Sequence, residues 1–391
     1  MTFRKMSATL PTLSPDELSR YSRHILLDEI GVEGQRRLAA AKVLVIGAGG
    51  LGSPAALYLA AAGIGTLGIA DLDRVEAHNL QRQLLHDTAS VGDSKVHSAA
   101  NRLKALNPHI SIFTHADGIQ PENAADIFRQ YDVIVDGTDN FTARYLNNEA
   151  AFATGKPLVF GSVFKFEGQV TLFDPASGGP CYRCLFPEPP EAGSVPGCGE
   201  AGVLGAVCGV IGSLQALEAI KHLLHMGRTL TGRLLTYDSL TQTFRTLTFI
   251  RAPGCPVCSR QENPTRQPID SATSSVAPSR AGEDIPLEIS VQEASDLLHR
   301  NRSGVQIIDV REPWETEICQ IESATFIPMR QIPQSLGSFS KEQHLLVLCH
   351  HGSRSQQVTT FLRAHGFHNV SNITGGINAW ATTVDRSMRQ Y

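Results

Sequence analysis

The sequence places one cysteine where a thiolate could act as a nucleophile. Cys349 ends the apolar run HLLVLC, and the segment HHGSRSQQV that follows is typical of a short loop leading into a helix. A thiol at such a loop faces backbone amides and the positive end of the helix, which favours its ionised form at neutral pH. Arg354 adds a positive charge and is expected to be a loop residue outside the core. His350 and His351 are better suited to line the loop as hydrogen-bond donors than to bind a metal.

A second reactive segment is built from glycines. Residues 45–52 read VIGAGGLG, an apolar strand that enters a turn at Gly47, Gly49, Gly50 and Gly52, and the helix-like run SPAALYLAAAG follows. The amides of such a turn and the helix N-terminus bind the phosphates of a nucleotide. Asp71 lies 19 residues beyond Gly52, where a ribose-binding acid is expected. The glycines alone do not distinguish NAD from ATP, because both ligands present phosphates.

The charged residues after this turn favour ATP. Asn79 and Arg82 fall in NLQRQ, Lys95 follows VGDS, and Asp139 lies in GTDN after the apolar run VIVD. A dinucleotide needs little cationic charge, whereas a reacting triphosphate needs cations and a carboxylate-held magnesium ion to neutralise the departing pyrophosphate. These residue types fit that role, although Arg82 or Lys95 alone could be an ordinary surface charge.

Four of the eight cysteines form two C-x-x-C pairs, CYRC and CPVC. Cys181, Cys184, Cys255 and Cys258 together supply four thiolates, which is enough for a closed tetrahedral zinc site with no open position. Such a site is structural. Disulfides are not expected, because a long chain of this kind uses cysteines for metal or catalysis more often than for disulfides. The alternative to a zinc site is two unrelated reduced pairs.

The elements that position these residues alternate between strand and helix. Ser14, Pro15 and Glu17 have the types of an N-cap, a first helical residue and a capping-box acid. AKVLVIGAGG and GTLGIADLD read as buried parallel strands around a helix, and DVIVDGTDN reads as a further strand. This alternation predicts a Rossmann-like, doubly wound α/β sheet. GQVTLFD and GRLLTYDSLTQTFRTLTFI predict an antiparallel extension of that sheet.

A second, smaller α/β domain is predicted after a linker. Residues 261–284 are rich in Pro, Ser, Thr and charge without periodicity. Beyond them, GVQIIDV and HLLVLC read as strands, and SQQVTTFLRAHG reads as a helix that ends at Gly366. The predicted organisation is a flexible N-terminus at 1–13, a nucleotide-binding domain with the zinc site at 14–260, the linker, and a C-terminal domain at 285–391.

The composition narrows the classes of partner and location. A formal net charge of −4 gives no support for nucleic acid or a membrane surface as the main partner. The N-terminus lacks the long apolar run of a signal peptide, and the apolar run AALYLAAAGIG is too short to cross a bilayer. A cytoplasmic location is therefore expected.

The order of these motifs resembles that of the MoeB/ThiF-type adenylyltransferases, relatives of the ubiquitin-activating enzymes. The motifs are GAGGLG, the D-x-D at Asp71, NLQRQ, Lys95 and GTDN. The resemblance covers about residues 14–260 and extends to RYSRHILL, NPHI, EGQVTLF, CYRCLFP, EAGVLG and GVIGSLQALEAIK. It implies that the glycine turn binds ATP and that the fold is that of this family.

The resemblance also assigns expected roles. In the ATP site, Asp71 is expected to bind the ribose and Asp139 to hold a magnesium ion. The residues expected to contact the phosphates are Asn79, Arg82 and Lys95. It implies a homodimer in which Arg23 serves as an arginine finger for the neighbouring subunit. Cys198, in PGCGEAGV, matches the crossover-loop cysteine, which in related enzymes forms a thioester or a mixed disulfide. The sequence leaves open whether Cys198 is catalytic here. Cys208 and Cys319 are expected to serve in packing.

The C-terminal domain resembles the rhodanese sulfurtransferases over about residues 285–384. The matching segments are IIDVREPWE, HGSRS and NITGGINAW. The resemblance implies that Cys349 carries a persulfide and that Asp309 and Arg311 organise the fold and the mouth of the site. Four residues separate Cys349 from Arg354, one fewer than in cysteine phosphatases of similar architecture. The shorter loop suits the outer sulfur of a persulfide better than a tetrahedral phosphate.

Together the two resemblances imply one reaction sequence. The first domain adenylates the C-terminal carboxylate of a ubiquitin-like sulfur carrier protein that ends in a glycine pair, and the second delivers sulfur to give a thiocarboxylate. The sulfur donor, such as a cysteine desulfurase or thiosulfate, is not specified by the sequence. Neither is the pathway, which could be molybdenum cofactor, thiolated tRNA, thiamine, cysteine or siderophore biosynthesis. The alternatives are an NAD-dependent oxidoreductase fused to a sulfurtransferase and a non-catalytic carrier scaffold.

Overall fold

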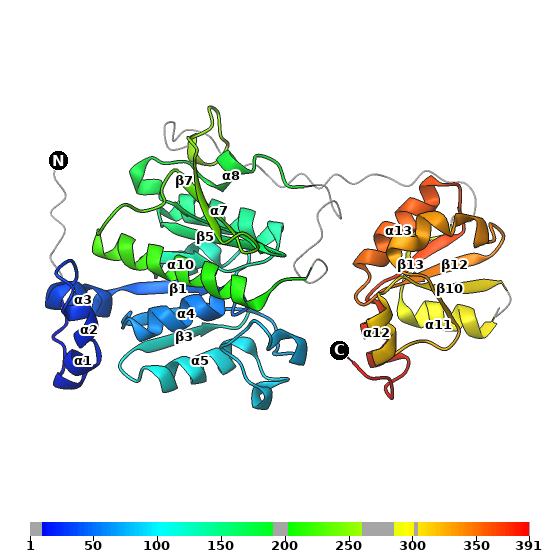
Figure 1. The fold of residues 1–391 in the computed structure, drawn as a ribbon, viewed down its shortest axis with the longest axis horizontal. Coiled ribbons are helices and arrows are strands. Elements are labelled where there is room, and N and C mark those ends of the chain that lie inside the picture. The colour runs from blue at the N-terminus through cyan, green and yellow to red at the C-terminus, as the bar shows by residue number, and fades with distance from the viewer. Residues whose placement is uncertain (1–9, 191–201, 260–284, 301–303, 391) are drawn as a thin grey trace. The chain divides into compact units, whose positions relative to one another are not determined.

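The chain divides into two compact units, Met1–Pro268 and Ile269–Tyr391. The computed structural model describes residues 10–190, 202–259, 285–300 and 304–390. Each unit has its own sheet with helices on both faces (Figure 1). The predicted linker at 261–284 lies outside the described residues, so the predicted domain limits stay a prediction.

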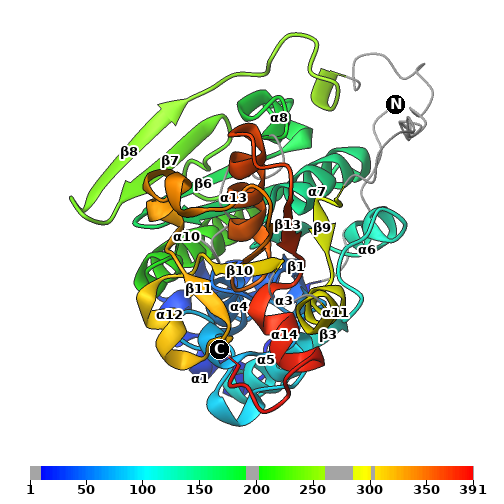
Figure 2. The same cartoon turned by 90° about the vertical axis from the view of Figure 1, so that its right-hand side faces the viewer.

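The first unit is built on an eight-stranded sheet. Its strand order is β3-β2-β1-β4-β5-β6-β7-β8, parallel from β3 to β5 and antiparallel from β5 to β8. Figure 2 shows the antiparallel strands β6, β7 and β8 side by side. In chain order the strands are β1 (Lys42–Ile46), β2 (Thr66–Ala70), β3 (Ser111–His115), β4 (Val133–Asp136), β5 (Leu158–Phe164), β6 (Glu167–Phe173), β7 (Arg233–Asp238) and β8 (Thr243–Thr248).

Alternation along β1 sends its side chains to two separate cores. Val43 and Val45 pack with one set of helices, whereas Leu44 and Ile46 pack with the other. The first set comprises α3 (Gly31–Ala40), α4 (Gly52–Ala61), α5 (Lys95–Leu106) and α10 (Gly205–Leu224). The second comprises α6 (Ala124–Arg129), α7 (Phe141–Thr154) and α8 (Tyr182–Leu185). The predicted doubly wound sheet with an antiparallel extension is confirmed.

Two short helices precede this sheet, α1 (Pro15–Arg20) and α2 (Ser22–Ile25). The predicted capping box is present, since Ser14 accepts a hydrogen bond from the Glu17 amide and the Glu17 carboxylate accepts one from the Ser14 amide. Tyr21 then anchors this segment to the C-terminal end of α5, because its buried hydroxyl accepts a hydrogen bond from Asn107 of the NPHI motif.

Helix α10 is more apolar and longer than sequence analysis recognised. Its 20 residues are long and apolar enough to cross a membrane. Half of the 18-residue apolar stretch within it is buried inside the protein. The buried part packs on β5, β6 and α4. Gln215 shows why it is a core helix, because its buried amide donates to the Asp136 and Val159 carbonyls at 2.7 and 3.2 Å.

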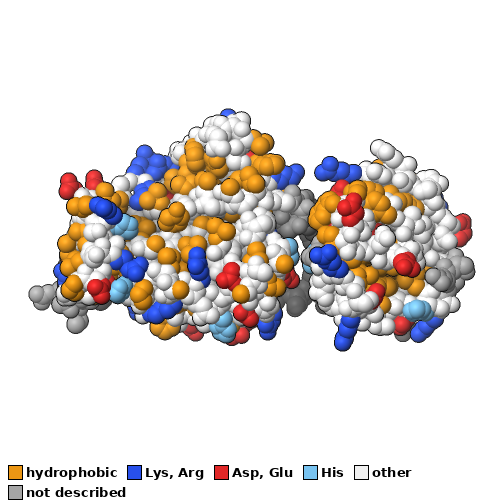
Figure 3. All heavy atoms as spheres, turned by 60° about the horizontal axis from the view of Figure 1, so that its bottom comes forward, with side chains coloured by type: hydrophobic (Ala, Val, Ile, Leu, Met, Phe, Trp, Pro, Cys, Tyr) orange, Lys and Arg blue, Asp and Glu red, His pale blue; other side chains and the backbone are white. Residues whose placement is uncertain are grey.

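The surface drawn in Figure 3 mixes side chains of every kind. Among the described residues on that face, basic and acidic groups are interspersed with hydrophobic ones rather than separated by sign. This face therefore presents no extended field of one charge.

The second unit contains a five-stranded parallel sheet in the order β11-β10-β12-β13-β9. Its strands are β9 (Glu288–Ile289), β10 (Val305–Asp309), β11 (Ala324–Phe326), β12 (His344–Leu348) and β13 (Val370–Ile373). Its helices are α11 (Val291–Arg300), α12 (Pro313–Ile318), α13 (Ser353–Ala364) and α14 (Gly376–Thr383). Trp380 and Leu346 lie in one core layer, and Val347 and Leu362 lie in the other. The predicted small α/β domain is thus confirmed.

Candidate functional site

A cavity of about 300 Å³ lies at the carboxyl ends of β1, β2 and β4 in the first unit. The strand order reverses between β1 and β4, and open α/β sheets bind ligands at such a switch point. The sequence-predicted residues that line the cavity are Gly47, Gly49, Gly50, Asp71, Arg82, Lys95 and Asp139. The volume is that of a small-molecule site.

The glycine turn is held by contacts that only glycine permits. Gly47 has a φ of +87°, and a Cβ on Gly52 would lie 1.7 Å from the Gly47 carbonyl oxygen. Gly52 is therefore a packing residue, while Gly49 and Gly50 face the cavity. A Cβ on Gly50 would lie 3.1 Å from the Cys208 sulfur. The turn thus leaves its backbone close to any ligand.

Asp71 and His86 hold Ala48 in the middle of the turn. The Asp71 carboxylate accepts from the Ala48 amide at 2.7 Å, and His86 Nε2 lies 3.0 Å from the Ala48 carbonyl oxygen. Burial lowers the pKa of His86, so the neutral ring donates to that carbonyl. Sequence analysis missed His86, because its contact spans 38 residues of chain and follows no motif.

Three charged residues, Arg82, Lys95 and Asp139, line the cavity. Lys95 is buried, and its Nζ lies 2.9 Å from Asp73, whose side chain is 57% exposed. An ion pair with so exposed a partner is weak, so Lys95 can turn to a phosphate. Arg82 donates to the His78 carbonyl at 3.2 Å, and Asp139 is exposed at the start of α7.

The remaining predicted residues lie elsewhere. The described residues that line the cavity include neither Arg23, exposed on α2, nor Asn79, whose buried amide accepts from the Glu76 amide at 3.2 Å. Cys198 lies outside the described residues. Cys208 is buried as expected, but it also lines the cavity.

Helix α7 contributes two cavity residues that sequence analysis did not single out. Arg144 lies over the rings of Phe141 and Phe160, and its guanidinium donates to the Thr138 carbonyl at 3.1 Å. Asn147 lies one turn further along the same face. Arg144 and Asn147 are three residues apart, a spacing that places both on one face of a helix, and this was the signal available in the sequence.

The four cysteines of the C-x-x-C pairs form one cluster. All four sulfur atoms lie within 4.8 Å of one another, with separations of 3.5 Å between Cys181 and Cys255 and 3.4 Å between Cys184 and Cys258. A tetrahedral zinc site with bonds of about 2.3 Å places its sulfurs about 3.8 Å apart. The donor set and its geometry therefore fit zinc.

The electrostatics of the cluster point the same way. Burial and the neighbouring sulfurs raise the pKa of Cys181, and burial raises the pKa of Cys258 to about 12. Several thiolates confined in one small volume repel one another, and a divalent cation removes that repulsion.

In the second unit, Cys349 is buried at the end of β12. Its sulfur accepts a hydrogen bond from the Gly352 amide at 3.1 Å and from the Ser355 hydroxyl at 3.2 Å. The loop curls against the TGG turn, since a Cβ on Gly376 would lie 2.4 Å from the Cys349 carbonyl oxygen. Gly352 and Ser355 supply donors to a negative sulfur.

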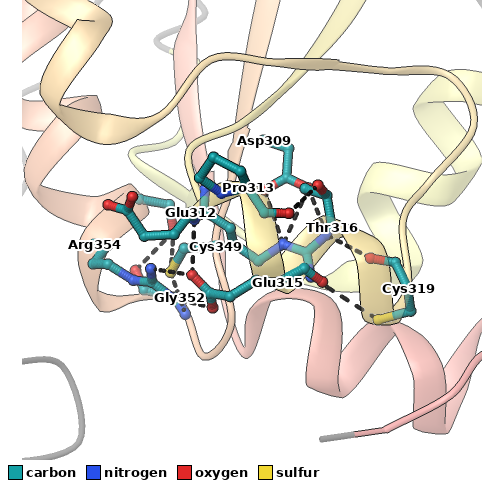
Figure 4. A network of polar contacts seen from close by, with 11 residues as sticks. Asp309, Glu312, Pro313, Glu315, Thr316, Cys319, Cys349, Gly352 and Arg354 are labelled. Atoms are coloured by element: carbon teal, nitrogen blue, oxygen red, sulfur yellow. Dashed lines mark hydrogen bonds and ion pairs between the residues drawn. The ribbon is translucent and has the colours of Figure 1, made fainter. Parts of the chain in front are cut away.

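Arg354 is paired with a carboxylate that sequence analysis missed (Figure 4). Its two terminal nitrogens lie 2.6 and 2.7 Å from the Glu315 oxygens, and its side chain is only 20% exposed. Arg354 is the second residue of α13 (Ser353–Ala364) rather than a loop residue, and it is half-buried beside Glu315 without belonging to a hydrophobic core cluster. Glu315 also caps α12 by accepting a hydrogen bond from the Glu312 amide at 2.8 Å. The spacing of three residues between these two acids was the sequence signal of this cap.

Asp309 and Arg311 form a buried ion pair beside this loop. Arg311 is fully buried, donates to both Asp309 oxygens, and reaches the Cys319 carbonyl at 2.8 Å. The pair fixes the segment between β10 and α12, which agrees with the expected organising role. Cys319 is half-buried, and burial raises its pKa.

Comparison with known proteins identifies the class. The ThiF family matches residues 21–257, and the rhodanese-like domain family matches residues 290–383. The chain belongs to the ThiF family and carries a rhodanese-like domain fused to it. It is an enzyme of this adenylyltransferase and sulfurtransferase class.

Two relatives share this organisation over nearly their whole length. The probable adenylyltransferase/sulfurtransferase MoeZ of Mycobacterium tuberculosis is 42% identical, covering 99% of this chain and all of the relative. The adenylyltransferase and sulfurtransferase MOCS3 of Culex quinquefasciatus is 41% identical, covering 97% of this chain and 90% of the relative.

Solved structures support the fold of the first unit. E. coli MccB determined with ATP has a TM-score of 0.54 and 24% identity, covering 61% of this chain and 74% of MccB. MccB determined with MccA-N7isoASN gives a TM-score of 0.55 at the same identity and coverage.

We predict one tightly bound zinc ion per chain. Cys258→Ser should lose the metal and lower the midpoint of thermal unfolding by roughly 6–12 °C, the shift that a loss of about 3 kcal/mol produces in a unit of this size. Cys319→Ser, outside the cluster, should keep both. Metal analysis and calorimetry measure the outcome; protein purified without chelators that contains no zinc contradicts the prediction.

Arg354→Ala should destabilise the second unit by about 3 kcal/mol, because it leaves the buried Glu315 carboxylate without its cation. The double variant Arg354→Ala/Glu315→Gln should recover at least half of the loss, since glutamine keeps the cap on α12. The only two tryptophans, Trp314 and Trp380, both lie in this unit, so their fluorescence reports its unfolding in denaturant. Equal stability of Arg354→Ala and wild type would contradict the prediction.

Proposed function

We propose that this enzyme activates the C-terminal carboxylate of a ubiquitin-like sulfur carrier protein with ATP and converts it to a thiocarboxylate with sulfur carried on Cys349. The observation that carries the proposal is the cavity at the sheet's switch point, which joins a phosphate-binding glycine turn to Arg82, Lys95 and Asp139. The names of the relatives state the two activities, adenylyltransferase and sulfurtransferase.

In the first step, a carboxylate oxygen of the carrier attacks the α-phosphorus of ATP, and pyrophosphate leaves. Asp71 binds the ribose, while Arg82 and Lys95 stabilise the charge that builds on the phosphates. Asp139 would hold a magnesium ion, for which an exposed carboxylate at the cavity is a suitable ligand. The ion would add positive charge next to the leaving group.

In the second step, the persulfide on Cys349 attacks the acyl-adenylate, and AMP leaves. The persulfide forms when the Cys349 thiolate takes the outer sulfur of a donor; with thiosulfate the leaving group is sulfite. A second thiol, which we assign to Cys198, then attacks the Cys349 sulfur and releases the thiocarboxylate. The resulting disulfide is reduced by cellular thiols. Gly352 and Ser355 support the negative charge on sulfur throughout.

The apolar part of the cavity lining supports a carrier that ends in two glycines. One end of the cavity is lined by Val163, Val203 and Cys208. The Cys208 sulfur comes so close to Gly50 that a Cβ there would meet it at 3.1 Å. A tail without side chains needs little room beside these apolar residues.

A homodimer would complete the site. Arg23 is exposed on α2 and lies outside the described lining of its own cavity. An apolar groove of about 820 Å³, formed by α4 and α10 and lined by Tyr58 and Leu217 among others, offers a surface for a second copy. We propose that the second copy supplies Arg23 to the phosphates.

The setting of the reaction follows from the same features. None of the seven described cysteines forms a disulfide, and we propose a reducing, cytoplasmic location. A cysteine desulfurase or thiosulfate would supply the sulfur, and synthesis of the molybdenum cofactor is one of the pathways that would use it. An NAD-dependent oxidoreductase has no use for Arg82, Lys95 and Asp139 together, and neither does an inactive scaffold.

Asp139→Ala should lower carrier-dependent pyrophosphate exchange by at least about 100- to 1,000-fold, the usual effect of removing one charge-stabilising group. Thiosulfate:cyanide sulfurtransfer should be unchanged. Mixing this variant with Arg23→Ala should restore part of the exchange, because a mixed dimer contains one intact site. Exchange by Asp139→Ala at a near wild-type rate would overturn the magnesium assignment.

Cys349→Ser should abolish sulfurtransfer and thiocarboxylate formation while leaving ATP-dependent adenylation intact, because only the sulfur-bearing atom is lost. Cys319→Ser serves as the matched control and should keep both activities. Mass spectrometry after thiosulfate treatment should locate one added sulfur at Cys349. Absence of that sulfur, or strong phosphatase activity in wild type, would contradict the assignment.

A further inference from the structure

One side chain in the nucleotide cavity is buried with its polar atoms unused. Asn147 of α7 is fully buried and lines the cavity. Within the described chain, neither its side-chain oxygen nor its side-chain nitrogen has a hydrogen-bond partner. A buried amide without partners is costly, and such groups are normally satisfied by a ligand or a water molecule.

The other polar residues on this wall are already engaged. The Asn140 side chain caps α7 by accepting from the Ala143 amide at 2.9 Å. The Arg144 guanidinium donates to Thr138 and lies over two aromatic rings. Asn147 is therefore the carboxamide on this wall that is open to a bound molecule.

The two ends of the cavity differ in which core they adjoin. Val163 and Cys208 belong to the apolar cluster around Leu51, at the end proposed for the carrier tail. Ile46 and Ala70 belong to the opposite cluster, to which α6 and α7 also contribute. Asn147 is on α7, so it lies with the second end.

This second end is where the base of a nucleotide belongs. Asp71, the expected ribose ligand, directly follows Ala70. Leu72 follows next, a Cβ on Gly118 would lie 3.3 Å from its side chain, and Ile119 packs against the cluster of Ile46 and Ala70. These residues and Ala143 give the end apolar walls suited to a flat ring.

A carboxamide complements the edge of adenine. Its oxygen accepts from the exocyclic amine while its nitrogen donates to the adjacent ring nitrogen. We propose that Asn147 makes this pair of hydrogen bonds and so determines the base specificity of the nucleotide site. The inference rests on the proposed function, because it takes ATP as the ligand.

Nucleotide binding without any carrier protein tests the inference. Calorimetry would compare ATP with purine riboside triphosphate, which lacks the exocyclic amine, in wild type and in Asn147→Leu. Wild type should bind the analogue about 10-fold more weakly than ATP, the usual effect of one lost hydrogen bond. Asn147→Leu should bind ATP about 10-fold or more weakly and should bind the two nucleotides equally, within about 2-fold.

Asn148→Ala is the matched control. The Asn148 side chain accepts from the Tyr182 amide at 2.9 Å, and the described cavity lining does not include it. This variant should lose thermal stability but keep the wild-type preference for ATP. Asn147→Leu should fold, because it removes two unpaired buried polar atoms. The comparison of the two nucleotides in wild type tests the inference without any variant.

Several results would overturn the inference. They are equal binding of both nucleotides by wild type, or an unchanged preference for ATP in Asn147→Leu. Unchanged nucleotide binding would mean that water satisfies the amide. If wild type bound no ATP at all, the proposed function would fail and the inference with it, whereas ATP binding without base discrimination defeats the inference only.

Discussion

The close approach of backbone at the glycine turn is the constraint on which the first unit depends. Gly52 leaves no room for a Cβ beside the Gly47 carbonyl, and the Gly137 backbone lies against Gly47 from the end of β4. This contact brings the ends of β1 and β4 together at the switch point of the sheet. The cavity, the backbone of the glycine turn that lines it and its charged residues all follow from that placement.

The second unit also depends on a close approach of backbone, here beside the sulfur of Cys349. Gly376 lets the TGG turn pack on the loop after Cys349, and the loop then aims the Gly352 amide at the sulfur. Ion pairs brace the surroundings, with Arg311 on Asp309 and Arg354 on Glu315. Charged side chains thus have different surroundings in the two units: they line the cavity in the first, and they form buried or half-buried ion pairs in the second.

Sequence analysis predicted the parts of the site that short motifs encode. The glycine turn, the strands on either side of it and the two C-x-x-C pairs depend on local spacing, so their structure could be anticipated. The contact between Cys181 and Cys255 could be anticipated because a closed zinc site needs all four thiols in one place. His86 and Glu315 were missed, because each acts through a contact with a distant segment. The ion pair of Arg354 was missed for the same reason, since its partner Glu315 lies 39 residues away along the chain.

The central claim is that ATP activates a carrier's carboxylate so that sulfur from Cys349 can replace one of its oxygens. The most direct measurement is mass spectrometry of a carrier protein with a C-terminal glycine pair, incubated with the enzyme, magnesium, ATP and thiosulfate. The account predicts a carrier in which one terminal oxygen is exchanged for sulfur, formed only with ATP and with release of AMP and pyrophosphate. Sulfur on the carrier without ATP, or an unchanged carrier across the ubiquitin-like sulfur carriers tested, would contradict it.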